Sequence, residues 1–187
     1  IVTTHSPTLA ASVDINSIKV LTIKKAGEPI SYTEISKCGL SDDTKYFLQR
    51  WLDITKSILL FAKGILLVEG IVEALVIKEL APYILRKLKS NTPQNLYLSN
   101  FEEYGISIIN LNGIYFNHFI APFKGYVNNA GGAITQCDYI PIKCAGLTDN
   151  DPDTAAAPTP LAPVGGNNAQ LYMIAELMVN SQMTRLF

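Results

Sequence analysis

Three short apolar runs, each ended or directly followed by polar residues, constrain the fold more than any other feature of the chain. They read ILLVEG at 65–70, ISIINLNG at 106–113 and IPIKCAGL at 140–147. Each is of strand length, and the first is continuously apolar rather than alternating, which is typical of a strand buried on both faces of a parallel sheet. Between them, residues 71–81 and 115–123 have helical patterns. Strands that alternate with helices predict an α/β fold in which helices flank a parallel sheet.

The remaining segments indicate extra structure around this sheet. Residues 1–10 predict the end of a buried strand followed by a polar turn, and residues 14–23 alternate well enough for another strand. A helix is expected from Ser41. Pro82 either ends the helix that begins at residue 71 or begins a second helical piece that reaches Lys89.

Composition limits the class of protein. With 187 residues, 48% of them apolar and 17% charged, the chain has ample material for a packed domain. The net charge of -1 gives no overall positive field, so DNA contact would need a local basic patch or bridging metal ions. Three cysteines without paired spacing indicate reduced, structural thiols. The most apolar stretch, 58–76, contains three charged residues, so we expect a cytoplasmic protein without a membrane helix.

Acidic residues follow two of the predicted strands. Glu69 ends the first strand, and Asp149 and Asp151 come directly after the third. The carboxyl ends of parallel strands share one edge of the sheet, where ligands usually bind. Glu73 follows Glu69 by four residues, which on a helix returns its side chain toward that edge. We therefore expect four carboxylates to converge.

Convergent carboxylates repel one another unless divalent cations bind between them. Two Mg²⁺ or Mn²⁺ ions in such a cluster would clamp a phosphodiester and activate water for hydrolysis. Taken singly, each acid is more often a helix cap, a turn residue or solvated surface, and residues 149–153 alone could be a turn containing proline. The combination favours a metal-dependent nuclease.

The same segments resemble a known family. LVEGIVEA at 67–74 and LTDNDPD at 147–153 look like the two signature segments of a Toprim domain, and INLNG at 109–113 is similar to the version in overcoming-lysogenization-defect (OLD) family ATP-dependent endonucleases. The resemblance implies a Rossmann-like sheet with Glu69 as general acid/base or metal ligand. It also implies that the metal ligands are Glu69, Glu73, Asp149, Asp151 and, extending the acidic loop, Asp153.

The family resemblance also implies an activity and partners. These are Mg²⁺- or Mn²⁺-dependent nicking or cleavage of DNA at a two-metal site, assembly as a homodimer or higher homo-oligomer, and a role in phage defence or repair. Whether a helicase-like protein is a partner stays open. The insertion at 125–138 departs from the family pattern and could reshape the DNA-facing edge. A further basic residue expected after the acidic loop is absent or only begun, which puts the activity of the chain alone in doubt.

The opening TTHSP at 3–7 resembles the switch-histidine segment that ends an ABC-type ATPase core. This implies that His5 senses ATP in a larger protein, because residues 1–187 contain no Gly-rich phosphate loop with Lys-Ser/Thr. We expect four parts: 1–40, the remnant of an ATPase domain; 41–63, a connecting helix; 64–153, the Toprim core; and 154–187, a flexible loop and the start of a C-terminal helical segment.

Other interpretations remain open at this stage. A Toprim core could serve strand transfer as in topoisomerases, primer synthesis as in primases, or assembly alone without catalysis. His118 lies among aromatic residues and could stack on a base, but a core or interface role is commoner. Arg86, Lys87 and Lys89 could touch phosphates, although a solvated helix end is the simpler interpretation.

Overall fold

A parallel sheet of three strands forms the centre of the protein. The computed structural model describes residues 1–23, 27–52, 56–90 and 100–148. The strands are β3 (Gly64–Val68), β4 (Ile106–Asn110) and β7 (Lys143–Leu147), in the order β4-β3-β7. All three coincide with the apolar runs, and both pairings are parallel. The predicted α/β class and the parallel sheet are therefore confirmed.

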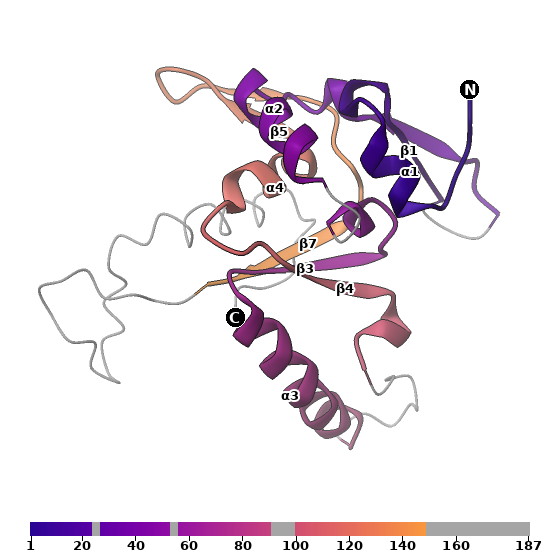
Figure 1. Ribbon diagram of the computed structural model, residues 1–187, viewed down its shortest axis with the longest axis vertical. Coiled ribbons are helices and arrows are strands. Elements are labelled where there is room, and N and C mark those ends of the chain that lie inside the picture. Colours follow the sequence, from indigo (N-terminus) through magenta and orange to yellow (C-terminus); the bar gives the residue numbers. More distant parts are fainter. Residues whose placement is uncertain (24–26, 53–55, 91–99, 149–187) are drawn as a thin grey trace, which may run out of the picture.

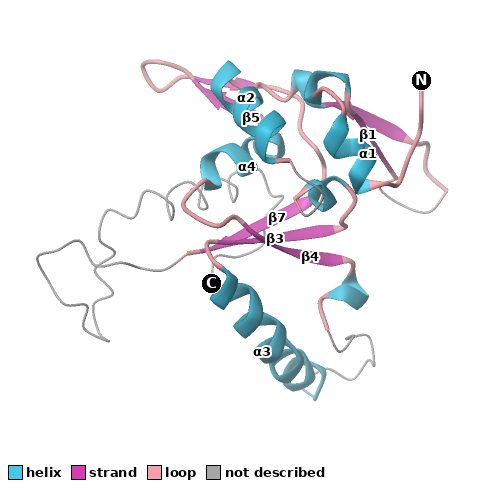
Figure 2. Cartoon of the chain, in the orientation of Figure 1, coloured by secondary structure: helices cyan, strands magenta, loops and turns pink. Residues whose placement is uncertain are grey.

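Two helices cover opposite faces of this sheet (Figure 1). Helix α3 (Ile71–Ser90) connects β3 to β4, and α4 (Phe116–Lys124) lies on the way from β4 to β7. Figure 2 shows α3 on one side of the strands and α4, with the N-terminal elements, on the other. The central strand is accordingly buried on both sides, and Ile65, Leu67 and Val68 are almost fully enclosed. This burial explains why the strand is continuously apolar.

Helix α3 continues through Pro82 to Ser90. Neither alternative predicted for Pro82 is observed, because the helix does not end at this residue and no second piece begins there. Proline lacks the backbone N–H that would bond to the carbonyl one turn earlier, which in this helix belongs to Lys78. The helix therefore tolerates one missing hydrogen bond in its middle.

The N-terminal part differs from the sequence prediction at its first residues. Residues 1–6 form no strand, and Ile1 and Val2 are exposed. The predicted buried strand is wrong. The following residues form helix α1 (Pro7–Ser12) instead of a turn, because the Ser6 hydroxyl accepts the Leu9 N–H and proline is favoured at the first helical position.

Strand β1 (Lys19–Thr22) falls within the predicted strand at 14–23, which otherwise begins with the short 3-10 helix η1 (Ile15–Ser17). It pairs antiparallel with β2 (Ser31–Glu34), which the sequence did not predict. Helix α2 (Asp42–Trp51) begins as expected after Ser41, whose hydroxyl accepts the Thr44 N–H. The described residues also contain three further 3-10 helices: η2 (Ile35–Lys37), η3 (Ser57–Leu60) and η4 (Glu102–Tyr104).

The predicted excursion at 125–138 is a small hairpin of β5 (Tyr126–Asn128) and β6 (Ile134–Gln136). One continuous core joins the N-terminal elements to the sheet, since Ile15 and Ile35 belong to the same buried cluster as Leu67 and Phe119. Within the described residues, no helix has the length and apolar character needed to cross a bilayer. The predicted spacer at 154–168 and the helical pattern at 169–178 lie outside the described residues.

Candidate metal centre

The candidate site lies where β3 ends and α3 begins. Val68 is level with Leu147 of β7, so the next residues along the two strands, Glu69 and Thr148, are also level. The Thr148 hydroxyl donates a hydrogen bond of 2.8 Å to Glu69 Oε2. The backbone carbonyl of Glu69 accepts the N–H of Gly113 at 2.9 Å. Residues after all three strands therefore meet around Glu69.

The topology places this meeting point where an open α/β sheet binds ligands. β3 is central, and the chain runs first to β4 on one side and then back across to β7 on the other. The connections after β3 and β4 leave on opposite faces of the sheet, so these neighbouring strands form a topological switch point, at whose carboxyl ends ligands usually bind. Glu69 stands at this switch point, and Thr148, which follows β7, is hydrogen-bonded to it.

Glu73 brings a second carboxylate toward the same end of the sheet, from the first turn of α3. Its Oε2 atom is buried and has no hydrogen-bond partner among the described residues. Gly70 leaves room for it, because a Cβ at that position would lie 2.8 Å from Glu73 Oε2. A buried carboxylate oxygen without a partner is costly, and a divalent cation removes the cost. These residues therefore fit a metal ion.

A loop of two asparagines borders Glu69 on the β4 side. The Asn110 side-chain amide donates to Asn112 Oδ1 at 2.8 Å, and the Asn112 N–H donates to Asn110 Oδ1 at 2.9 Å. Asn112 adopts a left-handed conformation with φ 55°. This turn directs Gly113 back to the Glu69 carbonyl, so the loop supports the site from its third side.

The structure brings two of the predicted site residues, Glu69 and Glu73, to the same end of β3. Asp149, Asp151 and Asp153 lie outside the described residues, beginning one position after Thr148. Among the described residues no three His, Cys, Asp or Glu side chains gather into a metal-binding group. The described part of the chain therefore holds the two glutamates of the five predicted ligands.

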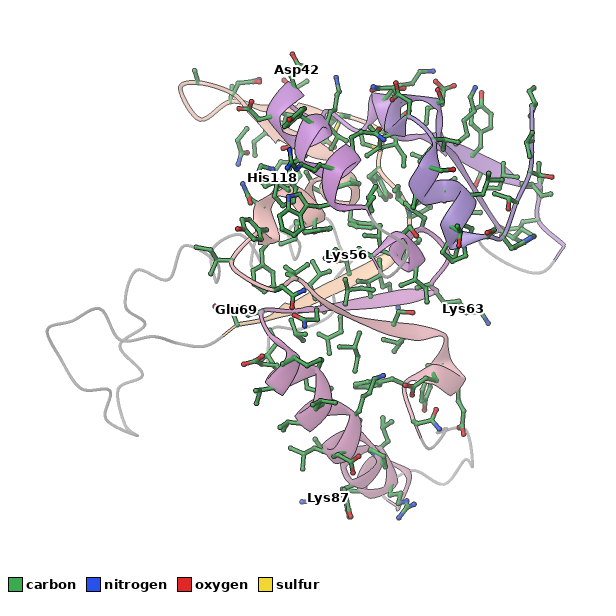
Figure 3. The ribbon with its side chains drawn as sticks, in the orientation of Figure 1. Asp42, Lys56, Lys63, Glu69, Lys87 and His118 are labelled. Carbon is green, nitrogen blue, oxygen red and sulfur yellow. The ribbon has the colours of Figure 1, made fainter. Side chains whose placement is uncertain are left out.

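His5 is far from this centre in the fold. It lines a pocket of about 440 Å³ together with Lys19 of β1 and Phe61, which precedes the start of β3. Glu69 lies at the opposite end of that strand, where β3 meets α3 (Figure 3). The predicted ATP-sensing role of His5 stays a prediction.

Sequence reasoning missed Thr148 as a site residue. It precedes Asp149 in the acidic segment, and a parallel register between the first and third strands would have placed it beside Glu69. The available signal was therefore its position at a strand end.

The cysteines are free thiols, as expected, and two of them are buried in the core. Burial raises the pKa of the Cys38 thiol to about 12 and that of Cys144 still further. Neither thiol is ionised near neutral pH, so both act as small apolar side chains.

An α/β domain with helices on both faces of a parallel sheet, and an acid at the carboxyl end of its first strand, is consistent with the Toprim class. Residues 60–151 match the family described as "Overcoming lysogenization defect protein-like, TOPRIM domain". This range therefore contains an OLD-like TOPRIM domain. Comparisons with curated proteins and with solved structures found no significant match.

Proposed function

We propose that this chain carries the nuclease site of an ATP-dependent DNA endonuclease that hydrolyses phosphodiester bonds with Mg²⁺ or Mn²⁺. The observation that carries the proposal is the buried Glu73 Oε2, which lacks a hydrogen-bond partner in the described part of the chain and stands at the same strand end as Glu69. The match to the OLD-like TOPRIM family supports the choice of nuclease chemistry. ATP dependence is proposed only for the full-length protein.

Glu69 and Glu73 would hold the metal, with Asp149, Asp151 and Asp153 as further proposed ligands. Divalent ions at such a site supply charge neutralisation for the phosphodiester and a water of lowered pKa. The chain itself supplies orientation, because Thr148 donates to one oxygen of the Glu69 carboxylate. Gly70 supplies the space in which the Glu73 carboxylate stays close to the backbone.

Metal binding by the chain is the first test. Titration calorimetry with Mn²⁺ should show saturable binding to the native chain, and Glu73→Gln should weaken it at least about tenfold because a charged ligand is lost. Glu79→Gln is the matched control, since Glu79 is exposed on the same helix. An absence of Mn²⁺ binding by the native chain would favour a catalytically inactive assembly module.

Cleavage is tested in the full-length protein with supercoiled plasmid and Mn²⁺ or Mg²⁺. Asp149→Ala should abolish nicking and linearisation, whereas Glu79→Gln should retain both. Undiminished cleavage by Asp149→Ala would refute the assignment of this acidic segment to the active site. Transfer of strands to a covalent protein linkage, rather than hydrolysis, would point to the topoisomerase-like alternative.

A further inference from the structure

Four rings from two elements form a stacked cluster beside the candidate metal centre. Phe47 of α2 is in the middle, with ring centroids 5.7 Å from Trp51 and 4.2 Å from His118, at interplanar angles of 18° and 20°. Tyr115, at the start of α4, lies 5.2 Å from Phe47 and 5.6 Å from Trp51. We call Phe47, Trp51, Tyr115 and His118 the ring cluster.

The ring cluster is not part of the buried core. Within α4, Phe116, Phe119 and Phe123 are fully buried, whereas Tyr115, the residue that precedes the helix, is 36% exposed. Phe47 and Trp51 are half-buried and pack against the core from outside. Large aromatic rings kept partly exposed are typical of surfaces that bind a partner.

Tyr115 connects the ring cluster to the metal centre. A Cβ on Gly113 would lie 3.0 Å from Cε2 of the Tyr115 ring, so the ring rests against this glycine. The N–H of Gly113 donates to the backbone carbonyl of Glu69. Gly113 has φ 140°, which few other residues adopt. The turn therefore holds the Tyr115 ring at the same sheet edge as Glu69. Figure 3 shows Glu69 where β3 meets α3, and His118 in the layer of α2 and α4.

Hydrogen bonds fix the inner member of the cluster. His118 Nδ1 lies 3.1 Å from the Thr44 hydroxyl, which itself accepts the Ser41 hydroxyl at 3.0 Å. Since the Ser41 hydrogen is directed at Thr44, the Thr44 hydrogen is available to donate to His118. His118 therefore supports Phe47 from within, as its predicted core or interface role requires, and Tyr115 is the outward ring.

The charge at this edge decides which part of a nucleic acid the rings can hold. The chain has a net charge of -1, and Glu69 and Glu73 place carboxylates at the sheet edge, so phosphate groups alone would bind weakly here. Aromatic rings bind bases without needing positive charge, because every base has a π-face. One cation contacts the cluster, since Lys56 Nζ lies 5.6 Å from the centroid of the Trp51 ring.

We propose that the ring cluster binds an unpaired nucleobase of the substrate, next to the phosphodiester that the metal centre cleaves. In a duplex, neighbouring base pairs cover the face of each base, so the bound nucleotide is single-stranded or flipped out. The proposal rests on the proposed nuclease function and narrows its substrate to DNA with an unpaired nucleotide beside the scissile bond.

Binding is measured on the whole chain in EDTA, so that no metal binds and no DNA is cleaved. Anisotropy of a short labelled oligothymidylate should give a Kd about tenfold weaker for Tyr115→Ala and Tyr115→Leu, because one stacking ring is lost. Tyr115→Phe should bind like the native chain. Tyr46→Ala is the matched control, since Tyr46 is 71% exposed on α2 and has no ring contact with the cluster. Trp51, the only tryptophan, should be quenched as the oligonucleotide saturates.

Two results would overturn the stacking proposal: equal affinity of Tyr115→Leu and Tyr46→Ala for the oligonucleotide, or equal affinity of the native chain for a blunt duplex of the same length. Its failure is distinct from failure of the nuclease proposal. Loss of metal binding leaves stacking in EDTA untouched, whereas loss of stacking leaves Mn²⁺ titration unchanged.

Discussion

The two helices that flank the sheet differ in how far their apolar residues are buried. Helix α4 buries Phe116, Phe119 and Phe123 completely, in a core that continues into the N-terminal elements. Helix α3 leaves a row of large apolar side chains exposed: Ile71, Val72, Leu75, Val76, Leu80, Tyr83 and Ile84. Stability therefore comes mainly from the α4 side. The α3 side has apolar surface available for association, and the carboxylates lie at the strand end from which α3 begins.

The largest expected effect is on the α4 side. Phe119→Ala should lower the free energy of unfolding by about 3 to 5 kcal/mol, because it removes a fully buried ring and leaves a cavity. Chemical denaturation monitored by Trp51 fluorescence measures this, with Tyr46→Ala as an exposed aromatic control. A loss below about 1 kcal/mol would mean that the core around α4 is far less tightly packed than described.

At the strand end between the two sides, Thr148→Val should cost about 1 kcal/mol of unfolding free energy, because Glu69 loses its hydroxyl donor at almost constant side-chain volume. The matched control is Thr135→Val on β6, whose hydroxyl accepts from Asn129 at an exposed position. We also expect weaker Mn²⁺ binding in Thr148→Val only. Identical stability and metal affinity in both variants would show that the Thr148 bond does not orient Glu69.

A smaller effect concerns pH and the contact between α2 and α4. Burial lowers the pKa of His118 below its ordinary value of 6.5, against a weaker opposing effect of Asp43. The unfolded chain thus binds the proton more readily, so this group's contribution to stability is present above pH 6.5 and is lost as the pH falls through and below that value. Denaturation series at several pH values should show that, below pH 6.5, the unfolding free energy falls less steeply with decreasing pH for His118→Gln than for the native chain. An unchanged slope would assign the pH dependence to other groups.

The sequence predicted those parts of the molecule that local patterns determine. The three strands were predicted from short apolar runs, although burial on both faces holds for β3 and not for β4 and β7. The position of Glu73 followed from its spacing of four from Glu69. Helix α1 was missed because the β-branched opening residues outweighed the Ser6-Pro7 helix start. Strand β2 was missed because SYTE is partly exposed and has no apolar alternation.

The contacts that depend on pairing between distant segments could not be predicted in the same way. The Thr148–Glu69 hydrogen bond needs the β3–β7 register, and the packing of Tyr115 against Gly113 needs the conformation of the turn after β4. Neither leaves a periodic trace in the sequence. The same limit explains why the ring cluster, built from α2 and α4, became apparent only in three dimensions.

The smallest expected effect on stability is on the α3 side. Leu75→Glu should change the unfolding free energy of the chain by less than about 0.5 kcal/mol, because the side chain is already 58% exposed in the middle of a helix. Sedimentation velocity on the same variant tests the homodimer or higher homo-oligomer that the family resemblance implies. A shift from dimer to monomer would assign the interface to α3, where a buried charge is not tolerated. A dimer that persists would place the interface elsewhere. A large loss of stability would show that α3 is covered within the chain itself, and the contrast between the two helices would then not hold.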